Sequence, residues 1–222
     1  MVVYQINSPK KRSLFRDLSL TTKLIILNVA LFIIFSLLIS LKILPPQYIY
    51  LSPSYILNNF YIWTLLTSMF MHGGIFHLFV NMMSLFFIGN LLEKILGRKR
   101  YLALYLLSGI FAGLLFVVSP LLFPQDMNTF AVGASGALFG LIGVLILLTP
   151  DLPVYMMFIP IPIKMKYAAP GMLILLWIIS ATAGLPIGNI AHLGGLISGV
   201  IYGFYLKHKF PNKIEFLKQR FK

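Results

Sequence analysis

The chain has 222 residues, of which 59% are hydrophobic and 10% are charged, with a net charge of +13 and no cysteine. Soluble domains carry about 25% charged residues, so this chain has too little charge to cover a water-exposed surface, and we expect a membrane protein. The missing cysteines exclude disulfides, thiolate zinc sites and a cysteine nucleophile. The basic residues lie in short clusters between apolar runs, which argues against nucleic-acid binding.

Six apolar runs approach the roughly 20 residues that a membrane-spanning helix needs. We expect six helices, at residues 24–41, 75–95, 101–119, 135–148, 167–182 and 189–206. The fourth is short for a lipid-facing span, so we expect it to be central and shielded by the others. Residues 152–163 are also apolar, but their three prolines would break a helix, and we interpret them as an interfacial loop.

The distribution of lysine and arginine predicts the orientation. With six spans, 17 of the 18 basic residues fall on one side of the membrane and only Lys42 falls on the other. The positive-inside rule then places both termini in the cytoplasm, and the cell membrane is the expected location. We divide the chain into a basic cytoplasmic N-terminal segment (1–23), a six-helix domain (24–206) and a basic cytoplasmic tail (207–222).

The segment between the first two helices, residues 42–74, is long, aromatic and almost uncharged. Tyrosine and tryptophan are favoured at the membrane interface, so we expect a loop partly embedded there. An ordinary extracellular loop is the alternative interpretation.

The predicted topology brings unusual polar residues to one depth. Helices two, four and six begin at the outer face. Near these starts, helix two has His77 and Asn81, helix four has Ser135, and helix six has His192. Polar groups within a membrane are costly and are usually functional or paired. Ser135 at a helix N-terminus, with a base and with N–H donors for an oxyanion, is the arrangement that a serine hydrolase needs.

Glycines predict how these helices approach each other. Gly136 and Gly140 on the fourth helix, and Gly195, Gly199 and Gly203 on the sixth, have the small-xxx-small spacing that permits close backbone packing in lipid. This packing would bring Ser135 and His192 within hydrogen-bonding reach.

Each signal also has a simpler interpretation. Ser135 alone could be a helix cap, and His192 alone could bond a carbonyl of a neighbouring helix. His77 and Asn81 share a helix face and could form half of a metal site, with Asp126 as the nearest carboxylate. Only the combination of these residues at one depth indicates a single reaction type, hydrolysis by a serine nucleophile.

The combined motifs resemble the rhomboid family of intramembrane serine proteases. The resemblance rests on Gly133-Ala134-Ser135-Gly136, on Ala191-His192-Leu193-Gly194-Gly195, on the series His72, His77, Asn81, and on Glu93-Lys94-Ile95-Leu96-Gly97. It runs from about residue 24 to residue 206, and it implies the six-helix rhomboid bundle with a membrane-embedded first outer loop.

The resemblance also implies roles for individual residues. Ser135 would be the nucleophile, His192 its general base, and His77, Asn81 and the Ser135 backbone N–H the oxyanion hole. Gly133 would permit close approach of substrate, with Gly136, Phe139, Gly195 and His72 as supporting residues. Residues 183–189 would form a flexible cap over the site, and the fifth helix would help to admit substrate.

Two positions depart from the family pattern. Trp63-Thr64 replaces the frequent Trp-Arg of the first loop, so an arginine-dependent anchor is absent. Phe139 replaces a frequent tyrosine four residues after the nucleophile. We expect activity to survive, with an altered orientation or pH dependence of His192.

These features predict an endopeptidase that cleaves transmembrane segments of membrane-anchored proteins near the outer face of the bilayer. Its partners would be those proteins and membrane lipids, with no cofactor, metal, nucleotide or nucleic acid. A catalytically inactive binder of transmembrane helices is the alternative. A solute transporter is a third class, but it would show sequence repeats that this chain lacks.

Overall fold

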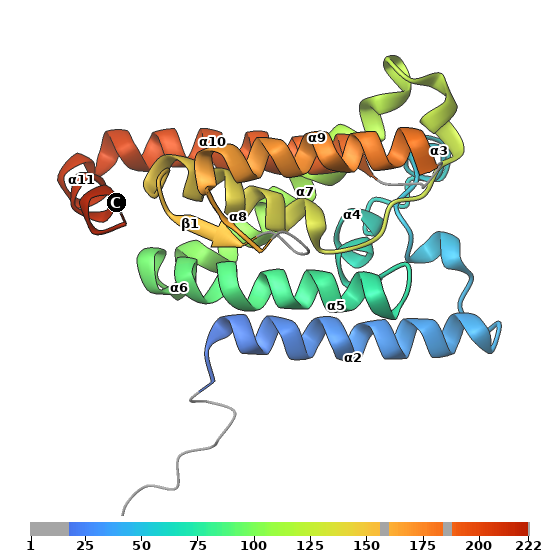
Figure 1. Cartoon of the computed structure of the whole chain (residues 1–222). Helices are drawn as coiled ribbons and strands as arrows, with labels where there is room; N and C mark the ends of the chain where they lie inside the picture. The colour runs from blue at the N-terminus through green and yellow to red at the C-terminus, as the bar shows by residue number, and fades with distance from the viewer. Residues whose placement is uncertain (1–17, 156–159, 184–187, 222) are drawn as a thin grey trace, which may run out of the picture.

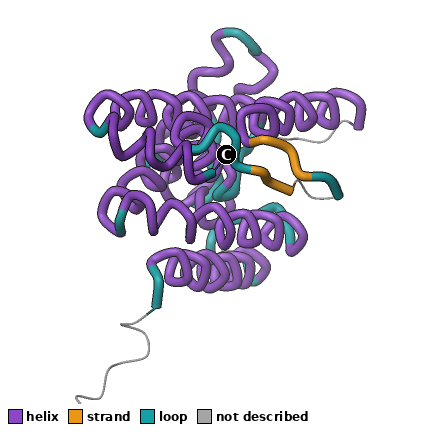
Figure 2. Tube along the Cα trace, turned by 60° about the vertical axis from the view of Figure 1, so that its left-hand side comes forward, coloured by secondary structure: helices purple, strands orange, loops and turns teal. Residues whose placement is uncertain are grey.

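The computed structural model describes residues 18–155, 160–183 and 188–221 (Figure 1). Most of the predicted N-terminal segment, and residues 184–187 of the predicted cap, lie outside this part of the chain. The described chain is almost entirely helical, with one small β-hairpin (Figure 2). Its long helices lie side by side along a common direction, with α2 at one edge (Figure 1).

Five helical segments in the described chain are long and apolar enough to cross a membrane. They are α2 (Leu20–Ser40), the continuous segment α5 (Ile75–Ser84), η3 (Leu85–Gly89) and α6 (Asn90–Leu96), α7 (Arg98–Val118), α9 (Met165–Ala183) and α10 (Asn189–Lys209). All five correspond to predicted spans. The second contains a π-helical turn, η3, which the apolar pattern did not predict.

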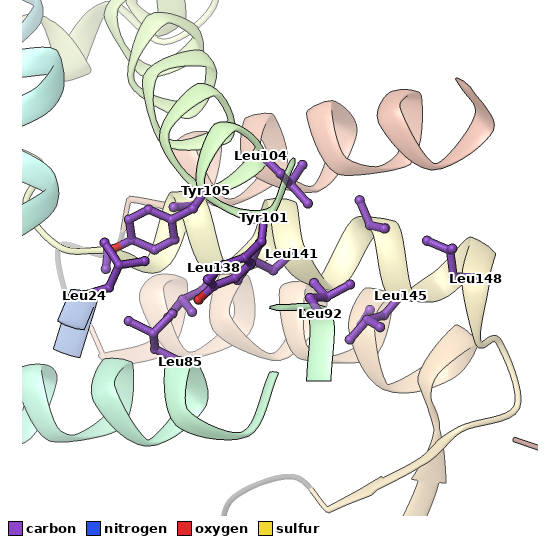
Figure 3. Packing of buried hydrophobic residues seen from close by; sticks show 14 of the residues in the cluster. Leu24, Leu85, Leu92, Tyr101, Leu104, Tyr105, Leu138, Leu141, Leu145 and Leu148 are labelled. Carbon is purple, nitrogen blue, oxygen red and sulfur yellow. The ribbon is translucent and has the colours of Figure 1, made fainter. Parts of the chain in front are cut away.

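Helix α8 (Ser135–Leu148) has the bounds predicted for the fourth apolar run. Its 14 residues extend about 21 Å, less than the roughly 30 Å hydrocarbon core. Most of its side chains are buried, and it packs against α7, α9 and α10. The predicted central position is therefore confirmed. Figure 3 shows its leucines facing Leu85, Leu92 and the two buried tyrosines of α7.

Glycine allows α8 and α10 to pack backbone against backbone. A methyl group added at Gly195 would overlap the Gly136 carbonyl oxygen, and one added at Gly199 would overlap that of Gly140. At Gly143 an added Cβ would lie 2.5 Å from the Leu196 carbonyl oxygen. We call these five residues the glycine interface. The spacing of Gly136, Gly140, Gly195 and Gly199 predicted this contact, and the structure confirms it. Gly143 was not predicted, and Gly203, which was, packs against the Leu147 side chain instead.

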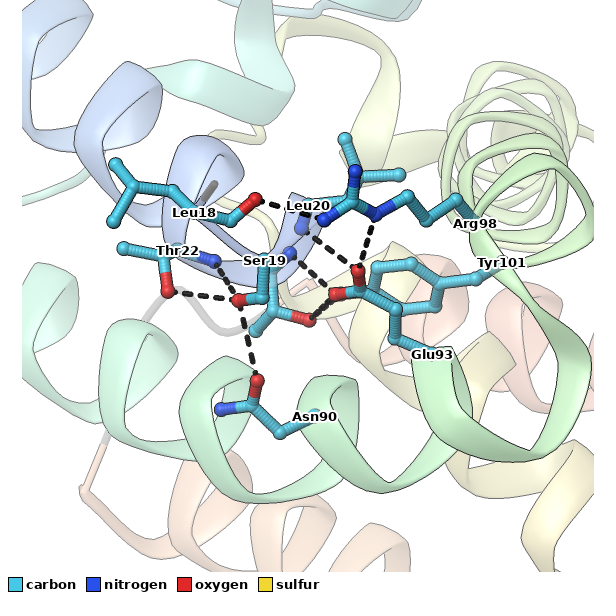
Figure 4. Close-up of polar contacts among 9 residues, drawn as sticks. Leu18, Ser19, Leu20, Thr22, Asn90, Glu93, Arg98 and Tyr101 are labelled. Atoms are coloured by element: carbon cyan, nitrogen blue, oxygen red, sulfur yellow. Dashed lines mark hydrogen bonds and ion pairs between the residues drawn. The ribbon is translucent and has the colours of Figure 1, made fainter. Parts of the chain in front are cut away.

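A polar cluster joins α2 to α6 and α7 (Figure 4). The Glu93 carboxylate accepts hydrogen bonds of 2.8 Å from the backbone N–H groups of Leu20 and Thr21, and one of 2.9 Å from the Thr21 hydroxyl. Arg98 donates to the same carboxylate at 3.3 Å and to the Leu18 carbonyl oxygen at 3.0 Å. This cap explains why α2 begins at Leu20, four residues before the predicted start, because Glu93 satisfies N–H groups that have no partner within the helix.

Most basic residues of the described chain lie at the end of the bundle where α2 begins. Because successive spans alternate in direction, α6, α8 and α10 end there, and α7 and α9 begin there (Figure 1). Lys42, after α2, lies at the opposite end. The predicted segregation of charge is thus present in space.

The segment between α2 and α5 folds into four short helices, η1 (Pro46–Tyr48), α3 (Pro53–Asn59), α4 (Thr64–Thr67) and η2 (Ser68–Phe70). The Trp63 indole N–H donates to the Tyr48 carbonyl oxygen at 3.0 Å, and the Thr64 hydroxyl donates to the Tyr61 carbonyl oxygen at 2.6 Å. These bonds fasten the loop without the arginine that is absent after Trp63. Two further short helices, η4 (Ser119–Leu121) and η5 (Pro124–Asn128), connect α7 to α8 at the end of the bundle opposite the basic end.

A β-hairpin and a short helix at the basic end were not predicted. Residues 152–163, interpreted as a loop, contain strand β1 (Pro153–Tyr155) and the first two residues of strand β2 (Pro162–Lys164). The two strands pair antiparallel, with Val154 opposite Ile163. Asp151 pairs with Lys164 at 3.0 Å and with Lys166 at 2.9 Å at the base of this hairpin. In the basic tail, helix α11 (Pro211–Arg220) buries Ile214 against the bundle.

Candidate functional site

The structure brings Ser135 and His192 together, although they are 57 residues apart in the chain. Ser135 is the first residue of α8, and His192 lies one turn into α10. The Ser135 Oγ and the His192 Nε2 are 2.7 Å apart, which is a short hydrogen bond. The glycine interface begins directly beside both residues, at Gly136 and Gly195, and this close packing of the two helices makes the short contact possible.

The His192 imidazole is fixed by an aromatic ring. It is 7% exposed and stacks on Phe139, with ring centroids 4.8 Å apart and planes inclined by 24°. When Nε2 accepts the Ser135 hydroxyl proton, Nδ1 must carry the ring proton of the neutral imidazole. Nδ1 has no hydrogen-bond partner within the described chain, so no carboxylate there orients this ring. Packing against Phe139 and the contact with Ser135 hold the ring.

His77 faces the same site through Gly133. The Gly73 backbone N–H donates to His77 Nδ1 at 3.1 Å, so the proton of a neutral His77 ring resides on Nε2. A Cβ at Gly133 would lie 3.0 Å from that Nε2 and 3.8 Å from the Ser135 Oγ. With a φ of +118°, Gly133 also has a backbone conformation that other residues rarely adopt. Glycine therefore leaves open the space between the imidazole N–H and the serine.

Asn81 lies one helical turn after His77 and is 3% exposed. Its amide nitrogen donates to the His77 carbonyl oxygen at 2.8 Å, and its Oδ1 has no partner within the described chain. One N–H of this amide is thus used to hold the side chain in place. The second remains as a donor for another oxygen.

His72 is buried and packs against the His77 ring. It is 1% exposed and meets the rings of His77 and Phe32 edge to face, at centroid distances of 5.3 and 6.1 Å. Burial first, and then the charge of His77, lower the pKa of His72 to about 4, while the Phe70 backbone opposes this shift. His72 is therefore neutral near pH 7 and packs as an aromatic ring beside His77.

The role of Gly73 was not predicted from the sequence. Its N–H group decides which nitrogen of His77 carries a proton, and the only signal was the Gly73-Gly74 pair four residues before His77. Asp126, the carboxylate considered for a metal site, accepts a hydrogen bond from Ser119 at 3.0 Å. No group of three histidine or acidic side chains within the described residues is arranged to hold a metal ion.

An apolar groove of about 430 Å³ lies between α9 and α10. Its lining includes Trp177 of α9 and Leu193, the neighbour of His192. The groove is almost free of polar atoms, so its surface suits a hydrocarbon environment.

The sequence of the chain is similar to those of proteins from plants and bacteria. It is 39% identical to RHOMBOID-like protein 1 of Arabidopsis thaliana over 158 residues, which are 69% of this chain and 37% of that protein. It is 37% identical to Inactive RHOMBOID-like protein 8 of Arabidopsis thaliana over 144 residues, 64% of this chain and 37% of that protein. A putative rhomboid protease of Bacillus subtilis, YdcA, is 42% identical over 83 residues, 37% of this chain and 39% of that protein.

Each alignment thus covers less than half of the relative's own length. The family model of the Rhomboid domain matches residues 59–209, a range that contains Ser135, His192, His77 and Asn81. Because this range is more than half of the chain, the protein belongs to the rhomboid family.

Proposed function

We propose that this protein is an intramembrane serine endopeptidase that cleaves transmembrane segments of membrane-anchored proteins. The observation that carries the proposal is the 2.7 Å contact between the Ser135 Oγ and the His192 Nε2. A serine used only as a helix cap bonds backbone N–H groups, and it has no need of a buried imidazole from another helix. A nucleophile needs this base.

In the proposed reaction, His192 Nε2 takes the proton of Ser135 as Oγ attacks the peptide carbonyl carbon. The oxyanion that forms would be stabilised by the Ser135 backbone N–H, the Nε2–H of His77 and the free N–H of Asn81. His192 then gives its proton to the leaving nitrogen as the C–N bond breaks. Water, activated by the same base, releases the acyl group as a carboxylic acid and restores Ser135.

The depth of the site determines which bonds can be cleaved. Ser135, His192 and His77 all lie near the end of the bundle opposite the basic end. With the basic end in the cytoplasm, the site lies near the outer face of the membrane, and both described ends of the chain lie inside. A helical substrate would have to unwind there, because its peptide carbonyls are otherwise hydrogen-bonded and shielded.

Family membership alone does not decide between a protease and an inactive binder, since one relative is named as inactive. The decisive test is labelling with a serine-directed fluorophosphonate in detergent. We expect the wild-type protein to react, and Ser135→Ala and His192→Ala to lose labelling. Ser198→Ala is the matched control, because Ser198 lies on α10 and donates to the Gly195 carbonyl oxygen, away from the base.

Cleavage of a reconstituted transmembrane substrate should follow the same pattern. Asn81→Ala should retain residual activity, since loss of one oxyanion donor costs about 10²–10³ in rate. Equal labelling of the wild-type protein and Ser135→Ala would end the nucleophile assignment. A folded wild-type protein that never reacts would favour the inactive binder.

A further inference from the structure

Three basic side chains surround one aromatic ring at the basic end of the bundle. The Arg100 guanidinium lies 5.0 Å from the centroid of the Phe210 ring, and the ammonium groups of Lys213 and Lys209 lie 5.7 and 5.9 Å from it. The three come from the start of α7, the end of α10 and the start of α11. Since all lie within about 6 Å of one point, no two of these cations are more than about 12 Å apart.

No carboxylate of the described chain neutralises these cations. Glu93 binds Arg98 and the start of α2, Asp151 binds two lysines at the base of the hairpin, and Asp126 binds Ser119. Glu215 forms no ion pair in this part of the structure, and all three cations are exposed. Among the residues that the structure describes, the one hydrogen bond of Lys209 is to the neutral Tyr205 hydroxyl, at 2.8 Å.

Three exposed cations that no carboxylate of the described chain neutralises repel one another, and salt screens this repulsion only in part, because separations of up to about 12 Å are comparable with the Debye length of about 8 Å at physiological salt. Attraction to the Phe210 ring offsets part of this repulsion. A multivalent hydrogen-bond acceptor with negative charge would remove the rest. We propose that Arg100, Lys209 and Lys213 form a binding site for the phosphate-bearing headgroup of an anionic phospholipid.

The position of the cluster favours a lipid over a soluble anion. Ile201 and Tyr205 precede Lys209 by two turns and one turn on the same face of α10, and they are 60% and 49% exposed. They form an apolar strip that leads from the membrane interior to the cations. A phospholipid would place its acyl chain along this strip and its phosphate at the three side chains, whereas free phosphate would leave the strip unused.

This site lies at the opposite end of the bundle from Ser135, and it does not depend on the proposed protease activity. The test uses the full chain in neutral detergent and measures the binding of phosphatidylglycerol and phosphatidylcholine by native mass spectrometry. We expect the wild-type protein to retain phosphatidylglycerol more tightly. Replacing Arg100, Lys209 and Lys213 together by Gln should weaken its binding by about 10²-fold, since each basic residue contributes roughly fivefold.

The matched control is the combined Lys99→Gln, Lys207→Gln and Arg220→Gln variant, which removes the same charge from exposed positions at the same end. It should change phosphatidylglycerol binding by less than the site variant. An equal loss in both would show diffuse attraction to the basic end and would overturn the proposal. Lys213→Gln alone, expected to weaken binding by about fivefold, serves if the triple variant does not fold.

Inorganic phosphate distinguishes the two sources of the anion. Millimolar phosphate should leave bound phosphatidylglycerol in place, because it cannot use the apolar strip. Complete displacement by phosphate, or equal retention of phosphatidylcholine, would mean that the site does not select an anionic lipid.

Discussion

The glycine interface offers a perturbation that substitutes neither Ser135 nor His192 nor any other residue of the candidate site. Gly143 lies two turns after Ser135 on α8, and a Cβ there would be 2.5 Å from the Leu196 carbonyl oxygen and 2.9 Å from the Val200 nitrogen. Both are backbone atoms, so no side chain can rotate away. Ordinary contact begins at 3.4 Å, and Gly143→Ala therefore requires α8 and α10 to separate by about 0.9 Å.

If that separation reaches the site, the contact between Ser135 and His192 lengthens from 2.7 Å to about 3.6 Å, beyond hydrogen-bonding distance. A displacement of about 1 Å can cost about 10²-fold in rate, and overpacking typically costs about 1–3 kcal/mol of stability. We expect fluorophosphonate labelling of Gly143→Ala to be slower by about 10²-fold, in protein that still elutes as a folded species.

The control is Gly171→Ala on α9, where an added Cβ meets nothing within 4 Å. This variant should label at the wild-type rate and should be slightly more stable, since alanine is favoured over glycine within a helix by about 1 kcal/mol. If Gly143→Ala labels as fast as Gly171→Ala, the close packing of α8 and α10 is not what aligns Ser135 with His192.

Three further predictions concern individual side chains. Phe139→Tyr adds a hydroxyl to the ring that stacks on His192, and it should move the midpoint of the pH–rate profile by up to about one unit; an unchanged profile would contradict this role of the ring. Glu93→Gln weakens the charged cap on α2 and should lower the free energy of unfolding by about 2–4 kcal/mol, which would appear as a thermal midpoint lower by about 5–10 °C. The control Glu215→Gln, at an exposed position, should change the thermal midpoint little. The pKa of His72 is about 4 when folded and 6.5 when unfolded, so the unfolded chain binds the proton first and stability falls as the pH drops from about 6.5 towards 4, by up to about 3 kcal/mol. Denaturant titrations at pH 7 and pH 4.5 should show a smaller pH effect in His72→Leu, and equal pH effects would refute the shift.

The sequence predicted those parts of the structure that depend on local pattern. Apolar run length located the long helices, and glycine spacing predicted the contact of α8 with α10. The approach of Ser135 to His192 followed from the two together, because alternating spans place the starts of α8 and α10 at the same depth.

Features that depend on partners distant in sequence were not predictable. Glu93 lies 73 residues after the Leu20 N–H that it caps, and no local pattern indicates that pairing. The hairpin at residues 153–164 depends on cross-strand pairing, and its apolar, proline-containing sequence indicated only an interfacial loop. Helix α11 is short and mostly polar, and only its packing, with Ile214 buried, makes it part of the bundle.

The cap on α2 also bears on the order in which this protein can assemble. The N–H groups of α2 emerge from the ribosome more than 70 residues before the carboxylate that satisfies them. At synthesis rates of about 5–20 residues per second, roughly 4–15 seconds pass before Glu93 exists. During that interval the start of α2 must be satisfied by water or lipid headgroups, and docking of α2 onto the bundle can be completed only after α6 has been made.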